Sequence, residues 1–175
     1  LFRSGDFDPA CFADAAVFHV CSNSLTDSAI AETTLTGMDA ARAVGAVVSM
    51  DLNLRPSLWP RGDDPVPRLW PALLKADLVK LSREEHDVLA RHAGSETAML
   101  DRLWQGRMRC LIVTDGEHAL HWHTRSASGE LPSFPVTPID TTAAGDAFVG
   151  GLLHHLVTQG IDIGEALGDP RHLVD

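Results

Sequence analysis

Cysteine is scarce in this chain of 175 residues, with only Cys11, Cys21 and Cys110, which lie far apart in the sequence. No two of them have the C-x-x-C spacing of a zinc or redox motif, and three widely separated cysteines do not indicate a disulfide framework. The sequence therefore argues against a disulfide-stapled scaffold and against a cysteine-ligated zinc domain. We expect a reducing, cytoplasmic environment.

Basic residues are also in short supply. Lys and Arg number 14 against 24 Asp and Glu, which gives a formal net charge of -10 at pH 7, and no local cluster of basic residues interrupts this pattern. An acidic surface repels nucleic-acid phosphates and anionic lipids. No apolar run approaches the roughly 18 residues of a membrane span. We therefore expect neither a nucleic acid nor a membrane as a partner.

What the chain does contain is a regular alternation of strand-length apolar runs with segments of helical period. With 45% hydrophobic residues and a mean hydropathy of 0.00, it has the composition of one packed domain or part of one. Strands are predicted at residues 15–21, 47–52, 78–81, 110–114 and 119–124, and helices at 26–44, 69–76, 82–93, 96–103 and 145–157. This alternation predicts an α/β domain whose mainly parallel sheet lies between helices.

Polar residues follow directly after the predicted strands, at positions 22–24, 51–55, 80–82, 114–116 and 140–142. In open parallel sheets, ligands bind outside the carboxyl ends of the strands, so these positions are the candidates for a site. The sequence has no GxxxxGK[ST] phosphate loop and no strand followed by GxGxxG. It therefore does not indicate a P-loop nucleotide hydrolase or a dinucleotide-binding site.

The most informative segment is IDTTAAGDAF at residues 139–148. Small residues at the start of an amphipathic helix leave backbone N–H groups open, and these groups attract an anion together with the helix dipole. Asp146 follows in the first turn, where its carboxylate can accept a proton. Phosphoryl transfer uses such a pairing. A plainer interpretation stays open, in which Asp146 is only a favourable helix charge and the small residues only allow close packing.

Four stretches, in order, resemble the signatures of the ribokinase-like (pfkB-type) carbohydrate kinases, most of all their fructokinase branch. Residues 140–151, DTTAAGDAFVGG, resemble D-T-x-G-A-G-D-x-F, and residues 50–59, MDLNLRPSLW, resemble D-x-N-x-R-x-x-L-W. Residues 76–85, ADLVKLSREE, resemble A-D-x-x-K-x-S/N-x-x-E, and residues 111–116, LIVTDG, resemble V-T-x-G. The resemblance implies that residues 1–175 are the nucleotide-binding and catalytic portion of one three-layer αβα kinase domain. The fold is then incomplete, without the N-terminal sugar-binding and lid part.

The resemblance also implies a role for each residue at a matching position. It makes Asp146 the general base, and it forms the anion hole from the backbone amides of Ala143, Ala144, Gly145 and Asp146. It assigns ATP to Lys80, Ser82, Glu85, Thr114 and Gly116, the sugar or its transferred phosphate to Arg55, Mg²⁺ through water to Glu85, and a monovalent cation such as K⁺ to Asp140 and Thr142.

The implied activity is the ATP-dependent phosphorylation of a small sugar, foremost of D-fructose to fructose 6-phosphate. A kinase for ribose or 2-keto-3-deoxygluconate and a non-catalytic nucleotide-binding module stay open as alternatives. The implied partners are the sugar and ATP, and the resemblance is compatible with a homodimer of the complete protein.

Two local expectations complete the sequence analysis. Ala143 stands where the signature has a glycine, and we expect a negative φ there because a positive φ costs an L-residue roughly 1–2 kcal/mol. His121 and His123 alternate on one face of a predicted strand with His118 nearby. A zinc or copper site at these histidines is therefore a competing hypothesis.

Overall fold

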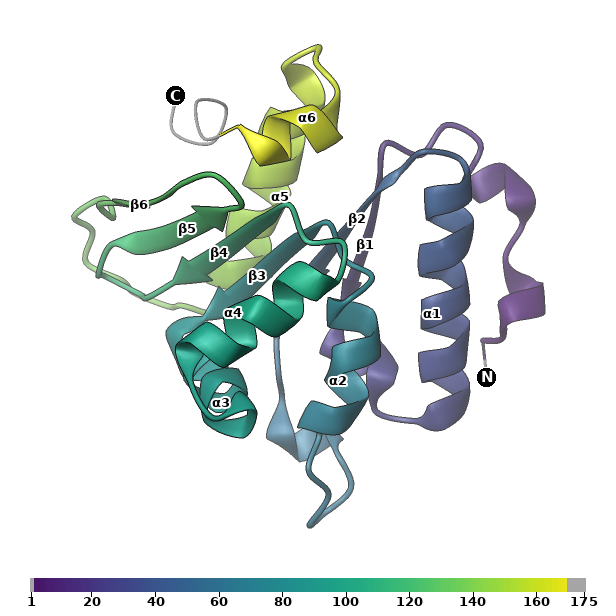
Figure 1. The fold of residues 1–175 in the computed structure, drawn as a ribbon, viewed down its shortest axis with the longest axis horizontal. Helices are drawn as coiled ribbons and strands as arrows, with labels where there is room; N and C mark the ends of the chain where they lie inside the picture. Colours follow the sequence, from purple (N-terminus) through teal and green to yellow (C-terminus); the bar gives the residue numbers. More distant parts are fainter. Residues whose placement is uncertain (1, 170–175) are drawn as a thin grey trace.

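A computed structural model describes residues 2–169, and its centre is a six-stranded sheet in the order β1-β2-β3-β4-β5-β6 (Figure 1). The strands are β1 (Val17–Cys21), β2 (Val47–Asp51), β3 (Leu78–Ser82), β4 (Cys110–Thr114), β5 (Leu120–Thr124) and β6 (Ser128–Leu131). The first four run parallel, and β5 and β6 continue the sheet antiparallel to their neighbours. The predicted α/β class and mainly parallel sheet are confirmed.

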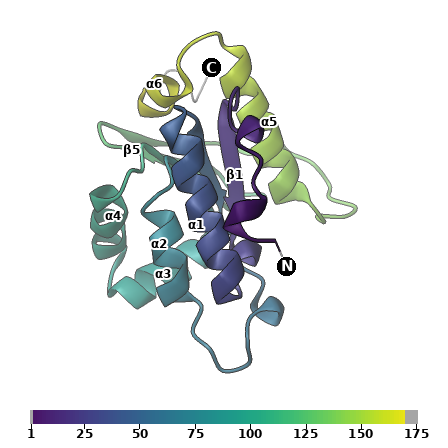
Figure 2. The same ribbon diagram turned by 90° about the vertical axis from the view of Figure 1, so that its right-hand side faces the viewer.

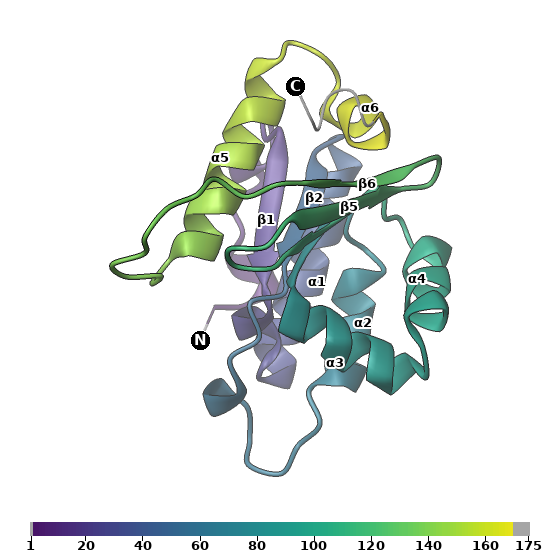
Figure 3. The same cartoon turned by 90° about the vertical axis from the view of Figure 1, so that its left-hand side faces the viewer.

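Helices cover both faces of the sheet and make three layers (Figures 2 and 3). One face carries α1 (Ser28–Ala43), α2 (Val66–Leu73), α3 (Arg83–Ala93) and α4 (Glu96–Gln105), and the other carries α5 (Ala144–Thr158) with α6 (Ile163–Gly168). Short 3-10 turns lie at η1 (Ser4–Asp6), η2 (Pro9–Cys11), η3 (Ser22–Leu25) and η4 (Pro56–Leu58). Within residues 2–169, no helix has both the length and the apolar character that crossing a membrane requires.

The sheet divides the core into two parts because side chains alternate between the faces of each strand. Toward α1–α4 the parallel strands bury Val20, Val48, Met50, Val79, Leu81, Leu111 and Val113. Toward α5 and α6 the sheet buries Val47, Leu78, Cys110, Ile112 and Trp122 against Leu156, Ala166 and Leu167. The second part is smaller and covers only a portion of its face.

The face that carries α5 changes from apolar to polar along the strands. After Val47, the next side chains on that face of β2 are Ser49 and Asp51, and after Leu78 the next on β3 is Lys80. These polar residues lie toward the carboxyl ends of the strands. The alternation therefore places charge at the end of the sheet where a parallel fold binds its ligands.

The predicted elements are all present, with ends that shift by at most a few residues. The largest shift is at α2, which begins at Val66 and not at residue 69. Its start includes Pro67, which is tolerated there because the first N–H groups of a helix have no partner within the helix. The elements β6 and α6 were not predicted, since both are short and β6 has Leu131 as its only apolar side chain.

Candidate active site

A cavity of about 360 Å³ opens where the carboxyl ends of β2, β3 and β4 meet the first turn of α5. Most of the predicted site residues line it: Arg55, Lys80, Ser82, Glu85, Thr114, Ala143, Ala144, Gly145 and Asp146. Asp51, Asn53, Leu54, Glu84 and Thr141 line the same cavity. All but Glu84 belong to the candidate positions after the predicted strands, and none of the five had been assigned a role. Segments far apart in the sequence are thus brought together by the parallel sheet.

The turn into α5 differs from the prediction at one residue. Ala143 precedes the helix with φ 61 and ψ 13, in the left-handed region, so the expected negative φ is wrong. The amide of Thr142 donates to the Asp140 carboxylate at 2.8 Å, and the amide of Ala144 donates to the Thr141 carbonyl at 3.1 Å. The chain reverses within this short turn, and the left-handed residue makes the reversal possible.

The first turn of α5 offers open backbone donors to the cavity. Within residues 2–169, the amides of Ala143, Gly145 and Asp146 make no hydrogen bond, whereas that of Ala144 is engaged by Thr141. Unsatisfied N–H groups and the dipole of this helix of 15 residues both favour an anion. Three of the four amides expected to form the anion hole are therefore free to bind an anion, and the anion hole itself stays a prediction.

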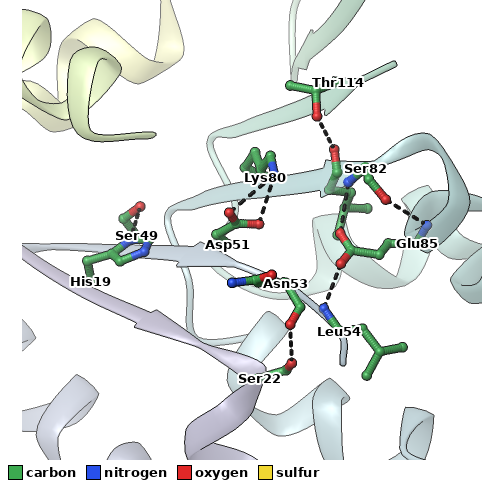
Figure 4. Close-up of polar contacts among 11 residues, drawn as sticks. His19, Ser22, Ser49, Asp51, Asn53, Leu54, Lys80, Ser82, Glu85 and Thr114 are labelled. Atoms are coloured by element: carbon green, nitrogen blue, oxygen red, sulfur yellow. Dashed lines mark hydrogen bonds and ion pairs between the residues drawn. The ribbon is translucent and has the colours of Figure 1, made fainter. Parts of the chain in front are cut away.

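The Asp146 carboxylate is exposed in the same turn and lines the cavity. His19 of β1, which no sequence pattern indicated, lies close enough for the negative charge of Asp146 to act on its ring. The His19 ring hydrogen-bonds to the Ser49 hydroxyl at 3.1 Å (Figure 4). Burial lowers the pKa of His19, and the negative charges of Asp51 and Asp146 oppose that shift. The carboxylates of Asp51 and Asp146 therefore both lie close enough to the His19 ring to influence its charge.

Lys80 reaches this environment from β3, where it forms an ion pair with Asp51. Its ammonium lies 3.2 Å from each oxygen of the Asp51 carboxylate (Figure 4). The side chains are only 9% and 4% exposed. Asp51 is among the candidate positions after the predicted strands, but the sequence analysis gave it no role. Its place in register with Lys80 on the next strand is the signal that indicates one.

Ser82 and Glu85 form a capping box at the start of α3. The Ser82 hydroxyl accepts from the Glu85 amide at 3.2 Å, and the Glu85 carboxylate accepts from the Ser82 amide at 2.8 Å. The other carboxylate oxygen accepts from the Leu54 amide at 2.6 Å (Figure 4). Burial raises the pKa of Glu85, and the two backbone hydrogen bonds oppose that shift. The box therefore also fixes a carboxylate at the cavity wall.

The remaining predicted residues lie on the other side of the α5 turn. Gly116 and Asp140 line a second, larger cavity of about 1000 Å³, together with residues 133–138. Thr141 and Ala144 line both cavities, so the two adjoin at the start of α5. Thr142 lines neither cavity. Its amide donates to Asp140, and this hydrogen bond lowers the pKa of the exposed Asp140 carboxyl.

The competing histidine hypothesis finds no support. His121 and His123 are ordinary members of β5, paired in register with Val113 and Leu111 of β4. Burial lowers the pKa of His123, which favours its neutral form. No group of three or more His, Cys, Asp or Glu side chains is arranged to hold a metal ion in the part of the chain that the structure describes.

The structure is a three-layer α/β domain with a cavity at the carboxyl ends of its parallel strands. Comparison with known proteins names its family. The family model described as pfkB family carbohydrate kinase matches residues 4–168. The chain belongs to this family. Fructokinase-1 of Zea mays is 37% identical over 175 residues, which are 100% of this chain and 53% of that protein.

Solved structures extend the similarity. A fructokinase of Xylella fastidiosa with bound ATP is 50% identical with a TM-score of 0.95, over 99% of this chain and 55% of that one. A fructokinase of Vibrio cholerae with fructose, ADP and potassium ion bound is 29% identical with a TM-score of 0.82, over 95% of this chain and 53% of that one. The chain therefore spans about half the length of the relatives it matches.

Proposed function

We propose that the complete protein catalyses the ATP-dependent phosphorylation of D-fructose to fructose 6-phosphate. The observation that carries this proposal is the cavity at the start of α5, where the Asp146 carboxylate, the open amides of Gly145 and Asp146, and the Lys80 ammonium meet. Similarity to the fructokinases of Zea mays, Xylella fastidiosa and Vibrio cholerae supports fructose as the sugar.

In the proposed reaction, a sugar hydroxyl attacks the terminal phosphorus of ATP. The new oxygen–phosphorus bond forms as the bond to the departing ADP breaks, and Asp146 accepts the hydroxyl proton before passing it to water. The transition state spreads negative charge over the equatorial oxygens of the phosphoryl group. The amides of Gly145 and Asp146 and the Lys80 ammonium stabilise that charge from fixed positions.

The remaining predicted residues receive roles on either side of this centre. We assign Ser82 and Thr114 to the phosphates of ATP, since both line the cavity beside Lys80. Gly116 lines the larger cavity, which has room for the nucleoside. Arg55 lines the cavity from the loop after β2 and is assigned to the sugar or its transferred phosphate.

Two cations belong to the proposal. The Glu85 carboxylate presents oxygen atoms that can act as ligands from the cavity wall. Each oxygen accepts one backbone hydrogen bond and keeps a further lone pair. This suits a hydrated Mg²⁺, which keeps several of its waters in protein sites and would neutralise phosphate charge. A potassium ion is assigned to the turn at Asp140 and Thr142, and the potassium-bound fructokinase of Vibrio cholerae supports its use.

The same proposal places the reaction in the cytoplasm, where its three cysteines stay as the free thiols of the structure. It also includes a homodimer of the complete protein, which light scattering of the purified protein would test.

ADP release from MgATP, measured with a panel of sugars, tests the proposed function. We expect fructose to be preferred over ribose, 2-keto-3-deoxygluconate and nucleosides. A clear preference for one of those others would refute fructose while keeping the kinase. ATP binding by calorimetry, measured alongside, separates a further case: a protein that binds ATP and phosphorylates no sugar is a nucleotide-binding module.

A further inference from the structure

The ion pair between Asp51 and Lys80 has no explanation in stability alone. Both side chains are buried, on adjacent strands and in register. Removing two charges from water is costly, and a well-packed apolar pair of similar volume stabilises a core as well or better. The charges therefore point to a role in the cavity that both residues line.

The position of the Lys80 ammonium relative to α5 indicates that role. A Cβ atom added at Gly145 would lie 3.1 Å from the Lys80 ammonium and 3.8 Å from the Asp51 carboxylate. The ion pair thus lies against the backbone of the first turn of α5, next to the open amides of Gly145 and Asp146. An ammonium has three N–H donors, and within residues 2–169 its only hydrogen-bond acceptors are the two Asp51 oxygens. A donor remains for an anion at this turn.

We propose that Asp51 is a positioning residue, whose carboxylate holds the Lys80 ammonium beneath the first turn of α5 so that it meets the transferring phosphoryl group. This inference rests on the proposed phosphoryl transfer and adds a residue to it. Asp51 touches neither ATP nor sugar in this scheme and acts through Lys80.

The need for a positioning carboxylate follows from the other charges in the cavity. Glu85 and Asp146 line the same cavity, and the Lys80 charge already counteracts the effect of burial on the pKa of Glu85. A lysine side chain has four rotatable bonds, so without Asp51 its ammonium would be free to turn toward either carboxylate. A charge that is fixed before the reaction stabilises the transition state more effectively than one that must reorganise.

Four proteins test the inference: the wild type, Asp51→Asn, Lys80→Met and the double variant. We expect Lys80→Met to lower kcat at least tenfold. Asp51→Asn lowers kcat about tenfold with ATP affinity level or tighter, because the change removes a negative charge from the cavity. The double variant matches Lys80→Met within twofold, since no ammonium is left to position.

A matched pair on the surface provides the control. Lys75 binds the Asp39 carboxylate at 2.6 and 2.8 Å, and neither residue lines the cavity. Asp39→Asn and Lys75→Met therefore keep kcat within twofold of the wild type. Asp51→Asn with kcat within twofold of the wild type overturns the inference. A double variant whose loss is the product of the two single losses does so too, because Asp51 would then act without Lys80.

Two further measurements cover failure of folding and failure of the proposed function. If Asp51→Asn does not fold, Asp51→Glu replaces it, because glutamate keeps the negative charge but moves the carboxylate by one methylene. A kcat of Asp51→Glu within twofold of the wild type then overturns the inference. If the wild type binds ATP and phosphorylates no sugar, the proposed function fails. The inference, which rests on that function, then falls with it, whereas an active wild type together with an Asp51→Asn kcat within twofold of it overturns the inference alone.

Discussion

Replacing Ala143 by glycine tests the turn on which the first helical residues of α5 depend. Ala143 has φ 61, a conformation that costs an L-residue roughly 1–2 kcal/mol and glycine almost nothing. The gain is offset by the greater freedom of glycine in the unfolded chain, worth about 0.4–1 kcal/mol. We expect a net stabilisation of about 0.5–1 kcal/mol. For a domain of this size that corresponds to a rise in Tm of about 1–4 °C.

The measurement is thermal unfolding followed by circular dichroism, with Ala147→Gly as the matched control. Ala147 is likewise exposed, but it lies within α5, so glycine there lowers stability by about 0.5–1 kcal/mol. The same substitution four residues apart thus has opposite signs. A fall in Tm for both variants would refute the left-handed conformation at Ala143. Turnover of Ala143→Gly should stay within about fivefold of the wild type, because the strain involved is about 1 kcal/mol.

Three other changes have defined outcomes. Asp146→Asn keeps the shape of the side chain and removes the proton acceptor, so kcat should fall on the order of 10²–10⁴-fold with ATP affinity almost unchanged; a folded variant within fivefold of the wild type would contradict the assignment as base. Gly145→Ala should lower kcat about tenfold, because the added Cβ would lie 3.1 Å from the Lys80 ammonium. In the control Gly150→Ala the added Cβ meets no atom within 4 Å, so this change should stabilise α5 by about 0.5–1 kcal/mol. The pKa of Glu85 is raised in the folded protein, so its contribution to stability is complete below its usual value near 4.5 and is lost as the pH rises through the raised value; urea unfolding should show this pH dependence in the wild type and not in Glu85→Gln.

Periodicity and end signals were sufficient to predict most of the fold. The buried strands β2, β3 and β4 are short apolar runs bounded by polar residues, and a serine cap with its reciprocal glutamate marked the start of α3. Such signals are local, so they can be read from the sequence alone. The strand β6 escaped prediction because it depends on pairing with β5 and has only Leu131 as an apolar residue.

The site was predictable where a motif carried it and was missed where three-dimensional pairing created it. Asp146, Lys80 and Asp51 all lie in recognisable segments, but the pairing of Asp51 with Lys80 emerges only when β2 and β3 are placed side by side in register. The backbone at Ala143 was predicted wrongly from intrinsic preference. Here the interactions of the tight turn between Asp140 and α5 stabilise the chain by more than the left-handed conformation of Ala143 costs.

The strand order of the sheet, which follows the order of the chain, has a consequence for how the protein folds. Within residues 2–169, each strand pairs only with its sequence neighbours, so every pairing closes a modest loop, such as that between Val17 and Val47. The entropic cost of closing a loop grows with its length. During synthesis, β1–β4 can assemble with α1–α4 while α5 is still unmade. One face of the nascent sheet, with Leu78 and Ile112, then stays open to chaperones or aggregation until α5 arrives.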